Sequence, residues 1–214
     1  METTTNRFKK NFADFQSKYD DESYMVNQKR KRELFSDVEG SVLEIGPGTG
    51  VNFVFLGNKP IKWMGIEPNG AMHPYLFEAA KKQGITASLL ECYTENICLG
   101  EHLMDYVIST EVLCSVTDLE KSLMEIKRVL KPKGKFLFLE HVVDHNNVLR
   151  RSVQKTVPHT PWKCYSDGCN PGRDIGKAIK NAGFSVVEYI DYMQEGTGII
   201  NMINKPHICG WAIK

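Results

Sequence analysis

A glycine-rich turn directly after a short apolar segment constrains the fold of this chain more than any other feature. Residues 42–45 are apolar apart from Glu44, and glycine then occupies every second position, at Gly46, Gly48 and Gly50. Because glycine has no Cβ, the backbone of such a turn can approach a ligand closely. The pattern predicts a strand that ends in a ligand-binding turn.

The spacing of these glycines disfavours two common phosphate-binding loops. A dinucleotide fingerprint requires a further glycine three residues after Gly48, where Val51 stands. A nucleoside triphosphate loop requires Gly-Lys-Ser or Gly-Lys-Thr, and the chain contains neither tripeptide. Glu67 ends the next apolar segment about twenty residues later, where an acid can accept both ribose hydroxyls. Together these features predict a ligand with adenosine but no pyrophosphate; the alternative is a plain turn and an exposed strand end.

Short apolar segments alternate with helical patterns along the rest of the chain. This alternation predicts an α/β fold, a doubly wound, Rossmann-like, mostly parallel seven-stranded sheet with helices on both faces. A helix is expected over residues 119–130, ending at the turn formed by residues 131–134. The expected strands lie near residues 42–45, 63–66, 86–90, 106–109, 135–140, 185–190 and 208–213.

The N-terminal segment, residues 1–36, is predicted to be a helical lid or flank. Phe8, Phe12, Phe15 and Tyr19 recur every three or four positions and would form one apolar stripe on a helix.

Residues 37–214 are predicted to form a single domain, in which residues 141–173 are an insertion on the substrate side of the sheet. A basic run at residues 29–32 could mark a nucleic-acid patch. Acidic residues at positions 20–22 and at Glu33 surround it, which favours a solvated helix face.

The charge balance argues against a polyanionic partner. Lys and Arg number 27, Asp and Glu number 26, and a formal charge of +1 provides no field that attracts nucleic acid or anionic lipid. The apolar runs are far shorter than the ~18–20 residues that a membrane-spanning helix needs, so no spanning segment is expected. We expect a small-molecule partner, and a monomer or a dimer.

Cysteine spacing indicates reduced thiols rather than a structural framework. No two cysteines form a CxxC pair, so neither a disulfide framework nor a metal site is expected, and a cytoplasmic location follows. The six cysteines are Cys92, Cys98, Cys114, Cys164, Cys169 and Cys209.

Four segments resemble, in their order along the chain, the motifs of class I S-adenosylmethionine-dependent methyltransferases: residues 44–50, 67–69, 92–96 and 128–134. The resemblance covers nearly the whole chain and implies S-adenosyl-L-methionine as the cofactor. The cofactor-binding residues that it implies are Glu44, Gly46, Gly48, Gly50, Asn52, Glu67, Pro68, Asn69, Tyr93, Thr94, Glu95 and Thr110.

In that family the amino acid end of the cofactor lies along the glycine turn. The resemblance further implies that Glu67 holds the ribose and that residues 93–96 border the adenine. Many relatives carry Asp where Tyr93 stands, so the adenine amino group would be read by Glu95, Asn96 or the backbone.

Further separated stretches resemble the methyltransferase-like thiol S-methyltransferases, which methylate alkyl thiols: residues 31–36, 112–116, 140–142, 167–170 and 206–214. This resemblance implies transfer of a methyl group to a small thiol. Two alternatives share the same cofactor motifs: O- or N-methylation of a small metabolite, and a catalytically silent protein that only binds the cofactor.

Thiol methylation needs an aligned, deprotonated sulfur. A free thiol has a pKa near ~8.5, so a neighbouring base or positive charge would raise the fraction of thiolate. The candidates at strand ends and in the connections beyond them are His141, His145, Asp167 and His207, of which Asp167 and His141 are predicted to be catalytic. The alternatives are a turn-forming role for Asp167 and a structural hydrogen bond for His141.

Aromatic residues in the same region are candidates for an apolar pocket wall. These are Phe8 or Phe12 in the leader, with Trp162 and Tyr165. Cys114 and Cys169 are expected to be small buried residues rather than nucleophiles, because no base stands beside them in the sequence.

Overall fold

The protein is described over residues 2–196 and 198–214 by a computed structural model, without the side chains of residues 2–5, 19–25, 199 and 200. Within this part of the chain, seven strands form one sheet, as the sequence predicts. The strands are β1 (Gly40–Ile45), β2 (Ile61–Ile66), β3 (Ser88–Leu89), β4 (Met104–Thr110), β5 (Leu130–His141), β6 (Val186–Met193) and β7 (Pro206–Ile213).

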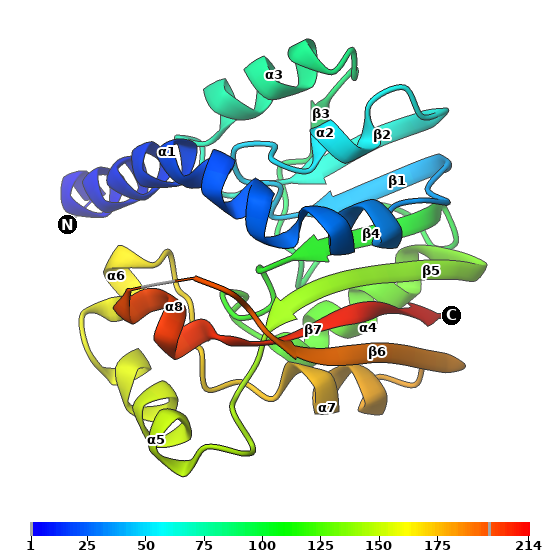
Figure 1. The fold of residues 1–214 in the computed structure, drawn as a ribbon. Helices are drawn as coiled ribbons and strands as arrows, with labels where there is room; N and C mark the ends of the chain where they lie inside the picture. Colours follow the sequence, from blue (N-terminus) through cyan, green and yellow to red (C-terminus); the bar gives the residue numbers. More distant parts are fainter. Residues whose placement is uncertain (1, 197) are drawn as a thin grey trace.

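The strand order is β3-β2-β1-β4-β5-β7-β6 (Figure 1). Strands β1 to β5 pair in parallel, whereas β7 lies antiparallel between β5 and β6. The chain winds outward in one direction from β1 and in the other from β4, so the order reverses between these two strands. In open α/β sheets, ligands bind outside the carboxyl ends of the strands at such a reversal.

Helices cover both faces of the sheet, which confirms the doubly wound architecture. They are α1 (Glu2–Leu34), α2 (Phe53–Leu56), α3 (His73–Lys82), α4 (Leu119–Val129), α5 (Val148–Thr156), α6 (Trp162–Tyr165), α7 (Ile175–Asn181) and α8 (Ile199–Asn204), with a short 3-10 helix over Val157–His159.

Consecutive strand residues point to opposite faces and so build two cores. In β4, Val107 packs with Leu123 and Ile126 of α4, while its neighbour Ile108 packs with Leu76 of α3 and with Phe35. Helices α4 and α7 thus cover one face, and α2, α3 and the end of α1 cover the other.

Strand β5 begins earlier than the sequence predicts. Its pairing with β4 shifts from Met104 opposite Leu130 to Tyr106 opposite Lys135, so residues 131–134 bulge out of the ladder. The turn that the sequence predicts at this point is this bulge, in which Lys133 adopts a φ of 67°. The strand continues on both sides of it because Leu130 still pairs.

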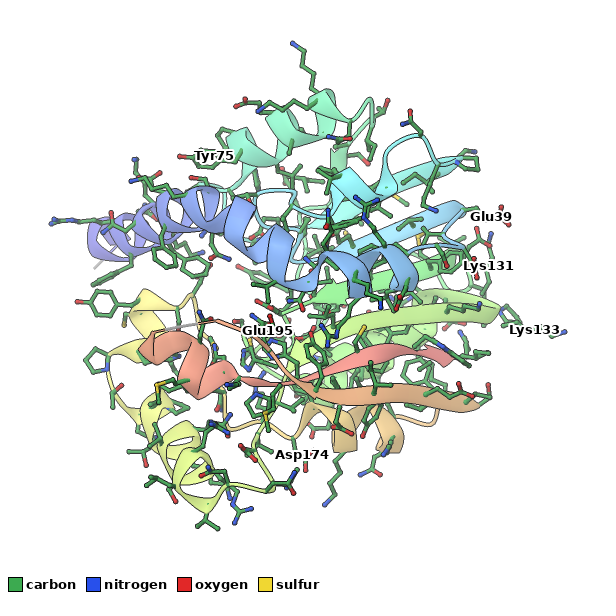
Figure 2. The ribbon with its side chains drawn as sticks, in the orientation of Figure 1. Glu39, Tyr75, Lys131, Lys133, Asp174 and Glu195 are labelled. Atoms are coloured by element: carbon green, nitrogen blue, oxygen red, sulfur yellow. The ribbon has the colours of Figure 1, made fainter. Side chains whose placement is uncertain are left out.

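The predicted N-terminal helix is present as α1. Tyr75 of α3 donates a hydrogen bond to Asp14 of α1 at 2.9 Å, and Figure 2 shows this tyrosine reaching toward the helix. Ala13 is fully buried. The side chains of Tyr19 and of residues 20–22 lie outside the described part of the structure. Among the described helices, none combines the length and the apolar character needed to cross a membrane.

Candidate active site

A cavity of about 480 Å³ lies at the carboxyl ends of β1, β2, β4 and β5. The residues that follow these strands form its floor. Helix α1 and residues 162–169 contribute the opposite wall. This is the position that the reversal in strand order predicts.

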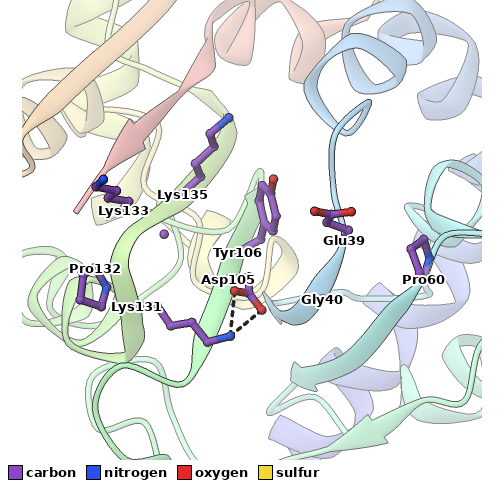
Figure 3. Close-up of a pocket in the computed structure, with 10 residues that line it drawn as sticks. Glu39, Gly40, Pro60, Asp105, Tyr106, Lys131, Pro132, Lys133 and Lys135 are labelled. Atoms are coloured by element: carbon purple, nitrogen blue, oxygen red, sulfur yellow. Dashed lines mark hydrogen bonds and ion pairs between the residues drawn. The ribbon is translucent and has the colours of Figure 1, made fainter.

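A second hollow of about 410 Å³ lies at the opposite edge of the sheet (Figure 3). Its central charges neutralise each other, because Lys131 Nζ lies 2.7 and 2.8 Å from the two carboxylate oxygens of Asp105. Asp105 also accepts the backbone N–H of Ser41 at 2.8 Å. Its central charged pair thus holds the sheet edge together, whereas the cavity at the carboxyl edge contains the glycine turn and Glu67, and we place the candidate active site there.

The glycine turn presents bare backbone to the cavity. Gly46, Gly48 and Gly50 have φ values of 56°, 57° and 86°, which side chains rarely adopt. A Cβ on Gly46 would lie 2.6 Å from the methyl groups of Val112, whereas a Cβ on Gly48 would meet nothing within 4 Å. Gly46 is therefore required for packing, and Gly48 leaves space for a ligand.

Glu67 is held beside this turn by two backbone N–H groups. One carboxylate oxygen accepts from Gly48 at 2.9 Å and the other from Asn69 at 2.8 Å. Burial raises the pKa of Glu67, with a further contribution from the charge of Asp167, and the two backbone donors oppose that shift. The side chain lines the cavity with its orientation fixed and lone pairs left to accept a ligand's hydroxyl groups.

Three of the predicted cofactor residues do not line the cavity: Glu44, Gly50 and Asn52. The Glu44 carboxylate accepts from Asn52 Nδ2 at 2.7 Å and from Trp63 Nε1 at 2.9 Å, and burial raises its pKa. Asn52 also donates to Thr110 Oγ1 at 2.9 Å. These contacts connect the turn to the end of β4.

Of the predicted adenine border, residues 93–96, the first three residues line the cavity together with Pro68, and Asn96 does not. Thr94 is buried and Tyr93 is exposed. Glu95 accepts the backbone N–H groups of Thr117 at 2.6 Å and Asp118 at 3.2 Å. Its carboxylate thus holds the loop before α4.

Asn69 ties two walls of the cavity together. It is 1% exposed, and its Nδ2 donates to the backbone carbonyl of Lys9 in α1 at 3.2 Å and to Asp167 Oδ2 at 3.1 Å. Asp167 has a φ of 47° in a turn that lines the cavity. The predicted catalytic Asp167 therefore lies at the end of the cavity that contains Glu67.

Aromatic side chains cover the cavity as the sequence suggests. Phe12 and Phe15 of α1 line it opposite Trp162 and Tyr165. Phe8 contacts the edge of Tyr165, with ring centroids 5.1 Å apart.

The other predicted catalytic residue, His141, lies at the end of β5 and is 3% exposed. Its Nε2 lies 3.3 Å from the sulfur of Cys169, and Cys114 completes a buried cluster on the cavity floor. The hydrogen bond with Cys169 and burial raise the pKa of Cys114 well above its ordinary value. The burial of both cysteines matches the expectation, but the histidine beside them was not predicted.

The two remaining candidate histidines have other partners. His145 pairs with Asp174 at 3.0 Å, outside the cavity. His207 Nε2 lies 3.4 Å from Glu111. Burial would raise the pKa of Glu111, but the hydrogen bond and charge of His207 outweigh it and lower this pKa.

Comparison with known proteins agrees with this geometry. Residues 43–138 match the model of a methyltransferase domain family. Thiol S-methyltransferase TMT1B of Rattus norvegicus is 34% identical over 203 residues, which cover 90% of this chain and 81% of the relative. Thiol S-methyltransferase TMT1A of Homo sapiens is 32% identical over 200 residues, covering 86% and 78%. The fold is similar to a SAM-dependent methyltransferase of Thermotoga maritima, with a TM-score of 0.64 at 20% identity over 97% of this chain and 99% of that one.

Proposed function

The chain belongs to the thiol S-methyltransferase family of S-adenosylmethionine-dependent methyltransferases, and we propose that it methylates the sulfur of a small-molecule thiol. The observation that carries the proposal is the pairing of Glu67 with the bare backbone of Gly48 in a cavity whose far end presents His141. The relatives' activity supports a thiol as the acceptor.

The residues present fit the cofactor. The open space at Gly48 and the fixed carboxylate of Glu67 suit an amino acid tail and a ribose diol. We propose that Gly46, Gly48, Glu67, Pro68, Asn69, Tyr93, Thr94, Glu95 and Thr110 line its site. Glu44 and Asn52 would support the turn, of which Gly50 is a part, from behind. When bound, S-adenosyl-L-methionine supplies a methyl group on a cationic sulfonium.

Strand order separates the two ends of the cavity. Glu67 follows β2 and His141 ends β5, with β1 and β4 between them. At about 4.8 Å per strand, the two residues stand roughly 14 Å apart, which leaves room for the cofactor at one end and an acceptor at the other. We propose that the acceptor sulfur lies beside His141.

Asp167 and His141 then have different roles. Asp167 accepts a hydrogen bond from Asn69, close to Glu67. We therefore propose that Asp167 positions residues 162–169 over the cofactor. His141 already lies 3.3 Å from a sulfur atom, that of Cys169, and we propose it as the residue that contacts the acceptor. The aromatic wall would exclude water from both reactants, which favours transfer between oppositely charged groups.

Turnover with three acceptors tests this function. We would incubate the protein with labelled cofactor and a simple alkyl thiol, a phenol or an amine. A methylated thiol as the main product supports the proposal. Methylation of only the phenol or the amine would instead indicate an O- or N-methyltransferase, and cofactor binding without any product would indicate a silent binding protein.

We also propose a cytoplasmic monomer or dimer that binds no nucleic acid. All six cysteines are free thiols, which suits a reducing compartment, and the net charge of +1 offers no attraction for nucleic acid. Light scattering after gel filtration and a gel-shift assay at low salt test these two statements, and imaging of the tagged protein tests the location.

A further inference from the structure

The cavity floor holds a cluster of soft metal ligands. Cys114 follows β4, His141 ends β5 and Cys169 lies in the turn after α6. One potential ligand atom from each side chain lies within 4.8 Å of the other two, and all three residues are buried. Among the described residues, this is the one group of three or more histidines, cysteines and acids with such spacing.

The separation between His141 and Cys169 is close to that between two ligands of a tetrahedral zinc ion. Zn–S bonds of about 2.3 Å and Zn–N bonds of about 2.0–2.1 Å place neighbouring ligand atoms roughly 3.5–3.8 Å apart. His141 Nε2 and Cys169 Sγ are 3.3 Å apart in the protein. Only small movements of the three side chains would be needed to close on a metal ion.

An unsatisfied buried atom belongs to the same cluster. The Nδ1 of His141 is buried and has no hydrogen-bond partner among the described residues. A buried polar atom without a partner is costly and calls for an ordered water molecule. Since Nε2 is the nitrogen that faces Cys169, Nδ1 would be the outward N–H of a histidine that binds a metal through Nε2.

We propose that Cys114, His141 and Cys169 bind a thiophilic divalent cation, Zn²⁺, with the fourth position open to the cavity. Three protein ligands and one free position distinguish catalytic zinc sites from closed structural sites. All three residues line the cavity, so the free position faces the space that an acceptor would enter. The sequence did not predict a metal because these ligands have no metal-binding spacing along the chain.

The open position explains how an acceptor thiol becomes a nucleophile, a step that rests on the proposed function. The S–H bond breaks, the proton leaves to solvent, and the sulfur's electron pair bonds to the metal. A metal-bound thiol is deprotonated at a pH at which the free thiol is not.

Metal analysis tests the site without any turnover. The chain is purified with a phosphine reductant, because thiol reductants would occupy the free position. We expect about one zinc per chain by mass spectrometry. The variants Cys114→Ser, Cys169→Ser and His141→Ala should lose it, while Cys209→Ser, a matched change of a buried cysteine outside the cavity, should keep it. Binding of adenosylhomocysteine checks that each variant is folded.

Cobalt titration of the metal-stripped native chain avoids dependence on variants. Charge-transfer bands from two thiolates and strong visible bands of tetrahedral Co²⁺ are expected at one equivalent. A chain purified without zinc that also gives no such bands would overturn the site.

An alkyl thiol added to the cobalt form should shift the visible bands, since it would enter the coordination sphere. Bands that stay unchanged would overturn the open position and leave a closed site. Failure of the proposed function appears differently, as a metal-loaded chain that binds the thiol but does not methylate it.

Discussion

Glu67 accepts the backbone N–H of Gly48 at 2.9 Å and so joins the carboxyl ends of β1 and β2 across the reversal in strand order. The bond brings the one acidic side chain predicted to hold a ribose to a glycine of the turn whose missing Cβ faces open space. This single contact therefore orients the Glu67 carboxylate and leaves the space beside the Gly48 backbone open to a ligand. The proposed cofactor site depends on it.

Replacing Glu67 by Ala should weaken adenosylhomocysteine binding. Hydrogen bonds to a charged group contribute about 1.5–3 kcal/mol, which corresponds to roughly a 10- to 150-fold rise in Kd. Isothermal titration measures this change, with Glu39→Ala at the opposite edge of the sheet as the control (Figure 3). Equal affinities for the native chain and Glu67→Ala would contradict the assigned role.

The affinity for adenosylhomocysteine should depend on the ionisation of Glu67. Burial raises the pKa of this carboxyl above its ordinary value, so the carboxylate needed for binding is lost at a higher pH than an ordinary glutamate would require. Affinity should fall as the pH decreases through that raised pKa. The dependence should vanish in Glu67→Gln, and its midpoint should move to lower pH in Asp167→Asn, which removes a like charge.

A Gly48→Ala change should distinguish an effect on folding stability from an effect on cofactor binding. The left-handed backbone costs an alanine about 1–2 kcal/mol, and no atom blocks the new methyl group. Gly84→Ala is the matched control, because Gly84 has a φ of 68° and equally open surroundings but lies outside the cavity. Both variants should lose similar unfolding free energy in urea, while only Gly48→Ala should lose cofactor affinity.

The fold was predictable because its signals are local. Each strand is a short apolar segment, and Pro132 with Gly134 marks the turn after α4. The start of β5 was not predictable from the sequence. Whether Leu130 still pairs before the bulge depends on the register of pairing with β4. The antiparallel insertion of β7 between β5 and β6 is likewise a matter of pairing rather than of composition.

The site was predictable only where the spacing of the partners along the chain is itself a known pattern. The glycine turn and Glu67 carry their spacing in the sequence. Cys114 and Cys169 stand 27 and 28 residues from His141, and only the sheet brings the three together. The same limit explains why Asp167 was grouped with His141, although the fold places it beside Asn69.

Two substitutions at position 167 distinguish positioning from acid–base catalysis. Asp167→Asn keeps an oxygen that can accept from Asn69 and tolerates the φ of 47°. If Asp167 positions residues 162–169 over the cofactor, Asp167→Asn should retain most of kcat, while Asp167→Ala should raise the KM for the cofactor more than it lowers kcat. If Asp167 is the base, both variants should lose kcat alike. Steady-state kinetics with an alkyl thiol decide between these outcomes.

The aromatic wall should set the preference for apolar acceptors. Each methylene buried against Phe12 and Trp162 contributes about 0.8 kcal/mol, so kcat/KM should rise about fourfold per carbon along a series of alkyl thiols. Phe12→Ala should flatten this slope and leave the shortest thiol nearly unaffected, because that thiol would reach His141 without touching α1. Phe77→Ala, at an exposed phenylalanine on α3, is the control and should keep the native slope. A slope unchanged in Phe12→Ala would mean that the alkyl chain leaves the cavity by another route and that α1 does not contact the acceptor.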